Sequence, residues 1–223
     1  NYGGRPFYSI NGSSPQDVNP MIDPNSDDLW IGSPALSYNG GDIINIAYND
    51  WTDENIYLFH GEAVLSSDDN IQFSEKIEIF NDLFIGEENA GYTSSPVLDI
   101  NDDGVGYLSV TANWEGSTAH TMVFAGTDDH GENWTSSFDG DLNSYYYIPD
   151  DVLSDLQEDY FPVEWDFDEC SSDEDPSADG LFLTYDFDLK VDMEGNPHFI
   201  VGVMTKLPDG YVYPAYPGAG FYH

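Results

Sequence analysis

The chain has 223 residues with 43 acidic and 4 basic side chains, which gives a formal net charge of −39 at pH 7. This charge excludes nucleic acid as a partner, because binding to phosphates requires clustered cations, and it disfavours anionic lipid surfaces for the same reason. The single cysteine, Cys170, excludes an internal disulfide. No stretch reaches the roughly twenty apolar residues of a membrane span, so we expect no membrane insertion.

The acidity also predicts the conditions that the chain tolerates. Repulsion among the carboxylates is screened by salt, since the Debye length is about 8 Å at physiological ionic strength and about 3 Å at 1 M. We expect either a halophilic or calcium-containing setting, or an acidic surface that only keeps a secreted protein soluble. The chain begins at Asn1, so we expect any signal peptide to have been removed already.

The first part of the chain divides into an N-terminal segment and an internal repeat. We interpret residues 1–30, which contain several glycines and prolines, as a closing strand or the remnant of a further unit. The repeat then follows in two landmarks. Ser33–Tyr38 matches Ser95–Ile100 at an offset of 62 positions, and Ser66–Phe73 matches Thr127–Trp134 at an offset of 61. Two landmarks in the same order at nearly equal offsets indicate duplicated structural units.

Each unit contains short β-prone runs separated by turns rich in Asn, Asp and Gly. After the Ser-Pro landmarks, the runs are 43–48 and 56–59 in the first unit and 107–111 and 121–124 in the second. With the landmarks they indicate about four antiparallel strands per unit, and a four-stranded sheet repeated radially is a propeller blade. The sequence therefore predicts an all-β protein, a β-propeller with two clear blades at 31–94 and 95–140.

A third, partial blade is predicted at 181–223. Apolar residues occupy every odd position of Leu183–Val191, which is the period of a half-buried strand. A turn at Asp192–Asn196 leads into a second apolar run, Pro197–Met204. We expect further blades from the same chain or from a partner chain, because a propeller has about four to eight blades.

An acidic insertion, residues 141–180, separates the second and third units. A short helix is predicted to start near Pro149, with an apolar face made of Val152, Leu153, Leu156 and Tyr160. Binding residues are often carried by loops on a rigid scaffold, so this insertion is a candidate for a specific surface. The alternative is a solvated decoration with no partner.

The second landmark of each unit follows the pattern hydroxyl-x-Asp-x-(Gly or Asn)-x-x-aromatic. The pattern positions are Ser66, Asp68, Asn70 and Phe73 in the first unit and Thr127, Asp129, Gly131 and Trp134 in the second. The hydroxyl and the Asp can accept hydrogen bonds from amides of their own hairpin. The Gly or Asn can adopt a left-handed backbone, and the aromatic ring can pack on the blade. We interpret both phrases as structural rather than catalytic.

The second phrase resembles the Asp-box, or bacterial neuraminidase repeat, at all four of its defining positions. The first phrase departs from it, with Asn70 in place of glycine and Phe73 in place of tryptophan. The resemblance covers residues 31–140 and 181–205 and implies a sialidase-like β-propeller, with the Asp-box between the third and fourth strands of a blade and away from the active centre. It also implies an extracellular or cell-surface location. Asp-boxes occur in hydrolases, receptors, assembly factors and adhesins, so the repeat leaves the activity open.

Sialidases of this fold hold a substrate carboxylate with an arginine cluster, and Arg5 is the only arginine here. We therefore expect a non-catalytic module that binds glycan or protein, with a hydrolase of neutral glycans that uses a carboxylate pair as the alternative. Aromatic rings suit both kinds of ligand. The candidate binding residues are Tyr145, Tyr146, Tyr147 and Trp165, for which packing within the blades is the competing interpretation.

Calcium is the only cofactor that the sequence suggests. Asp99, Asn101 and Asp103 match the opening D-x-N-x-D-G of a calcium loop, although Val110 stands where the twelfth-position acid is expected. The same segment also fits a plain hairpin turn between two strands. Both interpretations stay open at the level of sequence.

Overall fold

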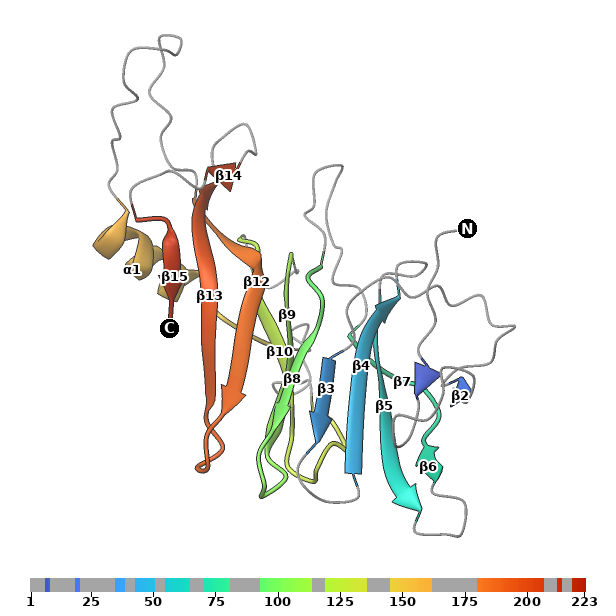
Figure 1. The fold of residues 1–223 in the computed structure, drawn as a ribbon. Coiled ribbons are helices and arrows are strands. Elements are labelled where there is room, and N and C mark those ends of the chain that lie inside the picture. The colour runs from blue at the N-terminus through green and yellow to red at the C-terminus, as the bar shows by residue number, and fades with distance from the viewer. Residues whose placement is uncertain are drawn as a thin grey trace, which may run out of the picture.

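The structure is a computed structural model that is mostly β, and the residues it describes form three antiparallel sheets, a two-stranded ribbon and one helix (Figure 1). It describes residues 7–8, 19–20, 35–38, 43–50, 55–64, 70–80, 93–113, 119–135, 145–161, 180–206, 212–213 and 218–223. The prediction of an all-β protein is confirmed at this level. Within the described ranges, no helix is long and apolar enough to cross a membrane.

The first sheet comes from the first predicted unit. Its strands are β3 (Ala35–Tyr38), β4 (Ile43–Asp50), β5 (Asn55–Val64), β6 (Asn70–Phe73) and β7 (Ile77–Phe80), with β6 and β7 both paired to β5. The N-terminal segment contributes β1 (Phe7–Tyr8) and β2 (Asn19–Pro20), which pair with each other as a ribbon. The described part of that segment is therefore a separate ribbon and adds no strand to the three sheets.

The second sheet has the order β11-β10-β9-β8. Its strands are β8 (Val97–Ile100), β9 (Gly106–Ala112), β10 (Thr121–Thr127) and β11 (Tyr146–Tyr147). The outer strand β11 comes from 141–180, the segment that was predicted to be an insertion. It joins the sheet because Val123 and Phe124 of β10 pair with Tyr147 and Tyr146.

The third sheet is built on a long hairpin of β12 (Gly180–Val191) and β13 (Pro197–Lys206). The outer edge of β13 pairs with two short strands, β14 (Val212–Tyr213) and β15 (Gly220–Tyr222). The predicted helix is present as α1 (Asp150–Tyr160), with acidic residues in its first turn as the helix dipole favours. On its predicted apolar face only Leu153 is buried, while Val152 and Tyr160 remain 51% and 58% exposed.

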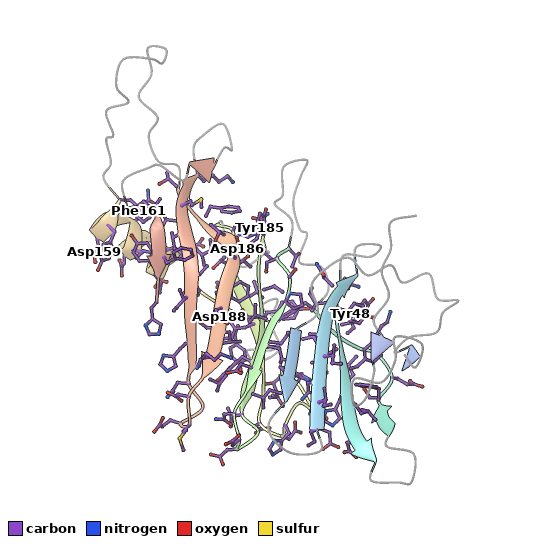
Figure 2. All side chains as sticks on the ribbon, in the orientation of Figure 1. Tyr48, Asp159, Phe161, Tyr185, Asp186 and Asp188 are labelled. Carbon is purple, nitrogen blue, oxygen red and sulfur yellow. The ribbon has the colours of Figure 1, made fainter. Side chains whose placement is uncertain are left out.

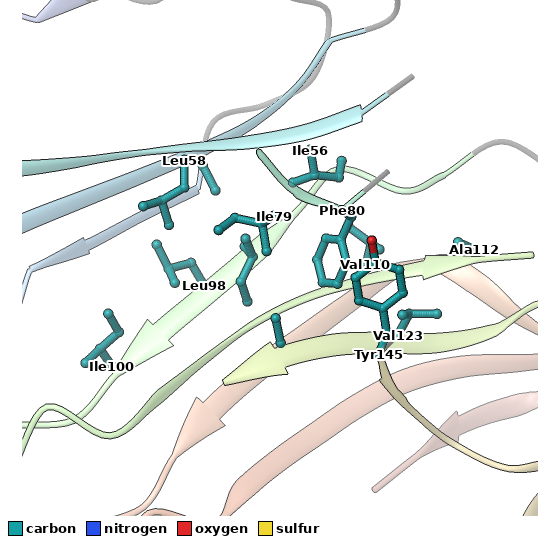
Figure 3. Close-up of a cluster of buried hydrophobic side chains, with 13 residues drawn as sticks. Ile56, Leu58, Ile79, Phe80, Leu98, Ile100, Val110, Ala112, Val123 and Tyr145 are labelled. Atoms are coloured by element: carbon teal, nitrogen blue, oxygen red, sulfur yellow. The ribbon is translucent and has the colours of Figure 1, made fainter. Parts of the chain in front are cut away.

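The three sheets stand in a row with their first strands adjacent, so that β8 contacts both β3 and β12 (Figure 1). The side chains of the second sheet alternate between its two faces. Both faces are buried, because each packs against neighbouring elements. Val123 and Ala125 pack against the first sheet in the cluster drawn in Figure 3. Met122 and Phe124 face the third sheet and α1, in a second cluster. The centre of the molecule is thus a layered core between sheets.

Candidate functional site

The Thr127–Trp134 hairpin holds its own polar groups. Thr127 Oγ1 donates to Asp129 Oδ1 at 2.9 Å and accepts from the Gly131 amide at 3.0 Å. The Asp129 carboxylate also accepts from the amide and the side chain of Asn133, at 2.9 and 2.7 Å. The half-buried Trp134 packs against the first core cluster and donates from Nε1 to the Gly131 carbonyl at 3.0 Å. These contacts all close the turn after β10.

The electrostatics of Asp129 follow from the same contacts. Burial alone would raise the pKa of the Asp129 carboxyl, but the hydrogen bonds from Asn133 and Thr127 stabilise the carboxylate and the pKa is lowered overall. The acid is therefore held in its charged form as an acceptor for the turn. An ionised carboxylate that accepts hydrogen bonds from its own turn is suited to holding the hairpin.

The first phrase is described only in part. Ser66 and Asp68 lie outside the described residues, and Asn70 belongs to β6. Phe73 packs edge-on against Phe59 at 6.3 Å between ring centroids, within a cluster on the outer face of the first sheet. Its aromatic ring thus packs on its own sheet.

Of the predicted calcium residues, Asp99 lies in β8 and Asn101 and Asp103 lie in the turn between β8 and β9. Asp99 and Asn101 contact the third sheet. Asn101 Oδ1 accepts from the amides of Asp103 and Val105, at 3.1 and 3.0 Å, and Asn101 Nδ2 donates to the Asp192 carbonyl at 2.8 Å. Asp99 accepts from the Val191 amide at 2.8 Å and from Lys190 Nζ at 3.3 Å. Within the described ranges, no group of three or more His, Cys, Asp or Glu side chains is placed to hold a metal. The turn serves here to join two sheets.

The three predicted binding tyrosines lie in the packing between elements. Tyr145 is 6% exposed, with its ring edge-on to Phe80 at 4.9 Å. Tyr146 stacks on Phe124 at 5.6 Å, and Tyr147 packs against the first core cluster. Tyr145 is therefore unable to present its ring to a ligand while the sheets stay together. Trp165 lies outside the described residues.

The turn between β12 and β13 also contains a carboxylate, Asp192, that accepts hydrogen bonds from residues close to it in the chain. Asp192 accepts from the amide of Asn196 at 2.8 Å and from its side chain at 3.0 Å, and it lies 3.1 Å from His198 Nε2. The hydrogen bonds from Asn196, and then the one from His198, lower the pKa of Asp192 from 3.8 to about 2. A depressed pKa of this kind stabilises the fold at every pH where the carboxyl is ionised.

Asp192→Asn is expected to remove a pH-dependent part of the stability. Because the carboxyl has a lower pKa in the folded chain, about 2 against 3.8, its contribution is present above about pH 4 and disappears as the pH falls to about 2. The melting temperature of the wild type should exceed that of the variant at pH 5, and the gap should close towards pH 2. Asp102→Asn, in the exposed β8–β9 turn, is the control. A gap that stays constant from pH 5 to pH 2 contradicts the assignment.

An exposed site that the sequence does not reveal lies on β12. The alternation of Leu183–Val191 predicts that Tyr185 points inward. Instead, β12 contains a bulge, because Leu183 pairs with Val203 whereas Phe187 pairs with Val201. The extra residues turn Tyr185 outward, where it is 41% exposed, and leave Asp186 exposed beside it (Figure 2). Bulges commonly redirect side chains near functional sites.

The backbone of this bulge is held from two sides. Thr184 Oγ1 donates to the Asp186 carbonyl at 3.2 Å, and Thr111 Oγ1 of β9 donates to the Thr184 carbonyl at 3.0 Å. Gly202 of β13 leaves room for the Thr184 side chain, since a Cβ at Gly202 would lie 2.5 Å from Thr184 Oγ1. The bulge is therefore a defined feature that the second and third sheets build together.

The Tyr185 ring packs against two other rings, those of His120 and Phe182. His120, which is 3% exposed, stacks on Phe182 at 4.3 Å, and the Tyr185 ring meets both at an edge, at 5.2 and 5.6 Å. His120 Nδ1 lies 2.6 Å from the Leu183 carbonyl, and because a carbonyl only accepts, Nδ1 is the donor. We call Tyr185, Asp186, His120 and Phe182 the bulge site. It combines a supported aromatic ring with an exposed carboxylate.

The comparisons with known proteins leave the chain without a family assignment. No protein-family description, curated protein or solved structure matches it.

Proposed function

We propose that the chain is a non-catalytic binding module built on part of a sialidase-like Asp-box β-propeller, and that the bulge site binds neutral glycan. Support for the scaffold comes from the row of three antiparallel sheets with adjacent first strands, and from the Thr127–Trp134 hairpin with its internal hydrogen bonds. The module is secreted or on a cell surface, in a setting with salt or calcium. Further blades come from the same chain or a partner.

The binding proposal rests on the outward Tyr185 ring, which packs against the buried His120 and the partly buried Phe182. An aromatic ring with fixed orientation offers an apolar face for the C–H groups of a sugar at little cost in side-chain entropy. The neighbouring Asp186 carboxylate accepts hydrogen bonds from sugar hydroxyls. The ligand is neutral because a net charge of −39 repels anionic sugars.

Tyr185→Ala is expected to weaken glycan binding without unfolding the chain. Loss of the stacking ring should raise the Kd about tenfold or more, which corresponds to about 1.4 kcal/mol. The measurement is an array of neutral glycans, with and without calcium, followed by titration of the best ligand. Tyr185→Phe should keep most of the affinity, and Tyr160→Ala, which removes a 58% exposed tyrosine on α1, is the matched control. Equal affinity in the Tyr185→Ala and Tyr160→Ala variants contradicts the proposal.

The alternative function is a glycan-directed glycoside hydrolase. Such enzymes use a pair of carboxylates, and Asp186 and Asp188 are both exposed on β12 (Figure 2). The same array distinguishes the two functions, because a hydrolase releases sugar from the bound glycan and a binding module does not. If the wild type releases sugar and the Asp186→Asn variant does not, the chain is a hydrolase and not a binding module.

A further inference from the structure

The pairing of the third sheet brings two histidines together. His198 belongs to β13, and His223 directly follows β15, which lies beside β13 (Figure 1). Tyr222 of β15 pairs with Val201, so the same antiparallel register puts His223 opposite Ile200, on the face of the sheet that also carries His198. The two imidazoles are therefore diagonal neighbours across adjacent strands, although 25 positions separate them in the chain.

The two rings meet through their nitrogens. His198 Nδ1 lies 3.2 Å from His223 Nε2. The ring planes are parallel to within 3°, and the ring centroids lie 5.3 Å apart. Because the two nitrogens are so much closer to each other than the centroids are, the rings lie edge to edge. Each ring therefore presents one nitrogen to the other.

Asp192 fixes which nitrogen of His198 carries a hydrogen. Its Oδ2 lies 3.1 Å from His198 Nε2, and an ionised carboxylate only accepts, so Nε2 is the donor. In the neutral ring the lone pair is then on Nδ1, the nitrogen that faces His223. Histidines that bind metal ions characteristically donate their other ring N–H to a carboxylate in this way.

The separation of the two nitrogens suits two ligands of one metal ion. Bonds of about 2.0–2.1 Å, at angles between about 90° and the tetrahedral value, put two ligand nitrogens about 2.9–3.4 Å apart. The observed 3.2 Å lies within this range. Both histidines are exposed, so a rotation of the rings can aim both lone pairs at one ion. Imidazole nitrogen is a ligand for copper, nickel and zinc, whereas calcium takes oxygen ligands.

The charge around the pair favours a dication. Asp155 and Asp159 of α1 line the same groove as the two histidines, and the whole chain carries a net charge of −39. In the part of the chain that the structure describes, no three His, Cys, Asp or Glu side chains are placed to hold one metal ion. We therefore assign Asp155 and Asp159 to the surrounding electrostatic field, and water to the other coordination positions.

We propose that His198 and His223 bind a divalent transition metal of the copper, nickel and zinc class, and that Asp192 positions His198 for this role. The ion links β13 to the residue that follows β15, and so holds β15 against the third sheet. The site contains no residue of the bulge site, so either proposal can fail without the other.

The first test is a calorimetric titration of the chain with Cu²⁺ and, separately, with Zn²⁺. Excess Mg²⁺ is present to occupy exposed carboxylates, and we expect Cu²⁺ to bind more tightly than Zn²⁺. His198→Gln and His223→Gln should each lower the Cu²⁺ affinity at least about tenfold, since loss of an outer partner alone costs about 10–100-fold. If both variants bind Cu²⁺ as tightly as the wild type, the proposal is overturned.

His130→Asn is the matched control for these two variants. His130 is a half-buried histidine outside the site, and asparagine tolerates its φ of 62°. We expect the Cu²⁺ affinity of this variant to equal that of the wild type. In addition, saturating Zn²⁺ should raise the Tm of the wild type and of His130→Asn by about 2–4 °C, and should leave the Tm of His223→Gln unchanged.

The second test identifies the ligands by electron paramagnetic resonance of the Cu²⁺ complex. We expect splitting from two imidazole nitrogens in the wild type and from one in His198→Gln. Asp192→Asn should keep both nitrogens while the affinity falls about tenfold. Asp155→Asn/Asp159→Asn should also keep both, with a smaller loss of affinity that salt removes. A signal from oxygen ligands alone assigns the ion to surface carboxylates and overturns the proposal.

Discussion

Phe80→Ala is expected to destabilise the chain by about 3–5 kcal/mol, the range for removal of a buried phenylalanine. Phe80 is fully buried at the end of β7, and its ring lies edge-on, at 4.9 Å, to Tyr145, which directly precedes β11 of the second sheet. The substitution therefore opens a cavity between two sheets rather than within one (Figure 3). Urea unfolding followed by tryptophan fluorescence measures the loss.

Phe221→Ala is the matched control for this substitution. Phe221 is 76% exposed on β15, so removal of its ring should change the free energy of unfolding by less than about 0.5 kcal/mol. If Phe80→Ala lowers the free energy of unfolding no more than Phe221→Ala does, the first and second sheets do not share the core described above. A loss of about 3–5 kcal/mol would also support the role of Tyr145 as a packing residue, because its ring contacts Phe80.

Gly131→Ala is the second substitution with a large expected effect, about 2–3 kcal/mol of destabilisation. Gly131 has φ of 88°, a left-handed conformation that costs an alanine about 1–2 kcal/mol. A Cβ at this position would also lie 2.5 Å from Asn45 Oδ1. Asn45 would have to move, and its 2.7 Å hydrogen bond to the His130 carbonyl would be lost, at about 0.5–1.5 kcal/mol. The midpoint of urea unfolding reports the sum.

The control for the glycine substitution is Gly220→Ala. Gly220 is exposed, has no positive φ, and its nearest neighbour for an added Cβ is 4.0 Å away. We expect a change within about 0.5 kcal/mol. A similar stability for both variants would mean that the Thr127–Trp134 hairpin tolerates a side chain at its glycine position and does not depend on the contact with Asn45.

The features that were predicted correctly are those set by short stretches of chain. The antiparallel strands follow from β-prone runs between turn residues, and helix α1 follows from Pro149 and the acidic first turn. In the Thr127–Trp134 hairpin, donor and acceptor lie within eight residues, so residue types and spacing suffice to anticipate the turn.

The bulge site depends on contacts that no local pattern contains. Leu183–Val191 has an unbroken alternation, yet Thr111 and His120 of the second sheet hold its backbone in a bulge that turns Tyr185 outward. Likewise, Asp99 reaches the Val191 amide across 92 positions in the chain. Interactions between residues so distant in sequence arise only when the sheets pack together, because their partners are brought close by the fold and not by spacing.

The sequence by itself determined the all-β class, the strands with their turns, and the Thr127–Trp134 hairpin, since these depend on residue propensity and hydrogen bonds within a few positions. The tertiary structure decided which aromatic rings are available to a ligand. It buried Tyr145 between two sheets and exposed Tyr185 at a bulge. The physical reason is that exposure of a ring is a property of the neighbouring sheets, and those come from segments far away in the chain.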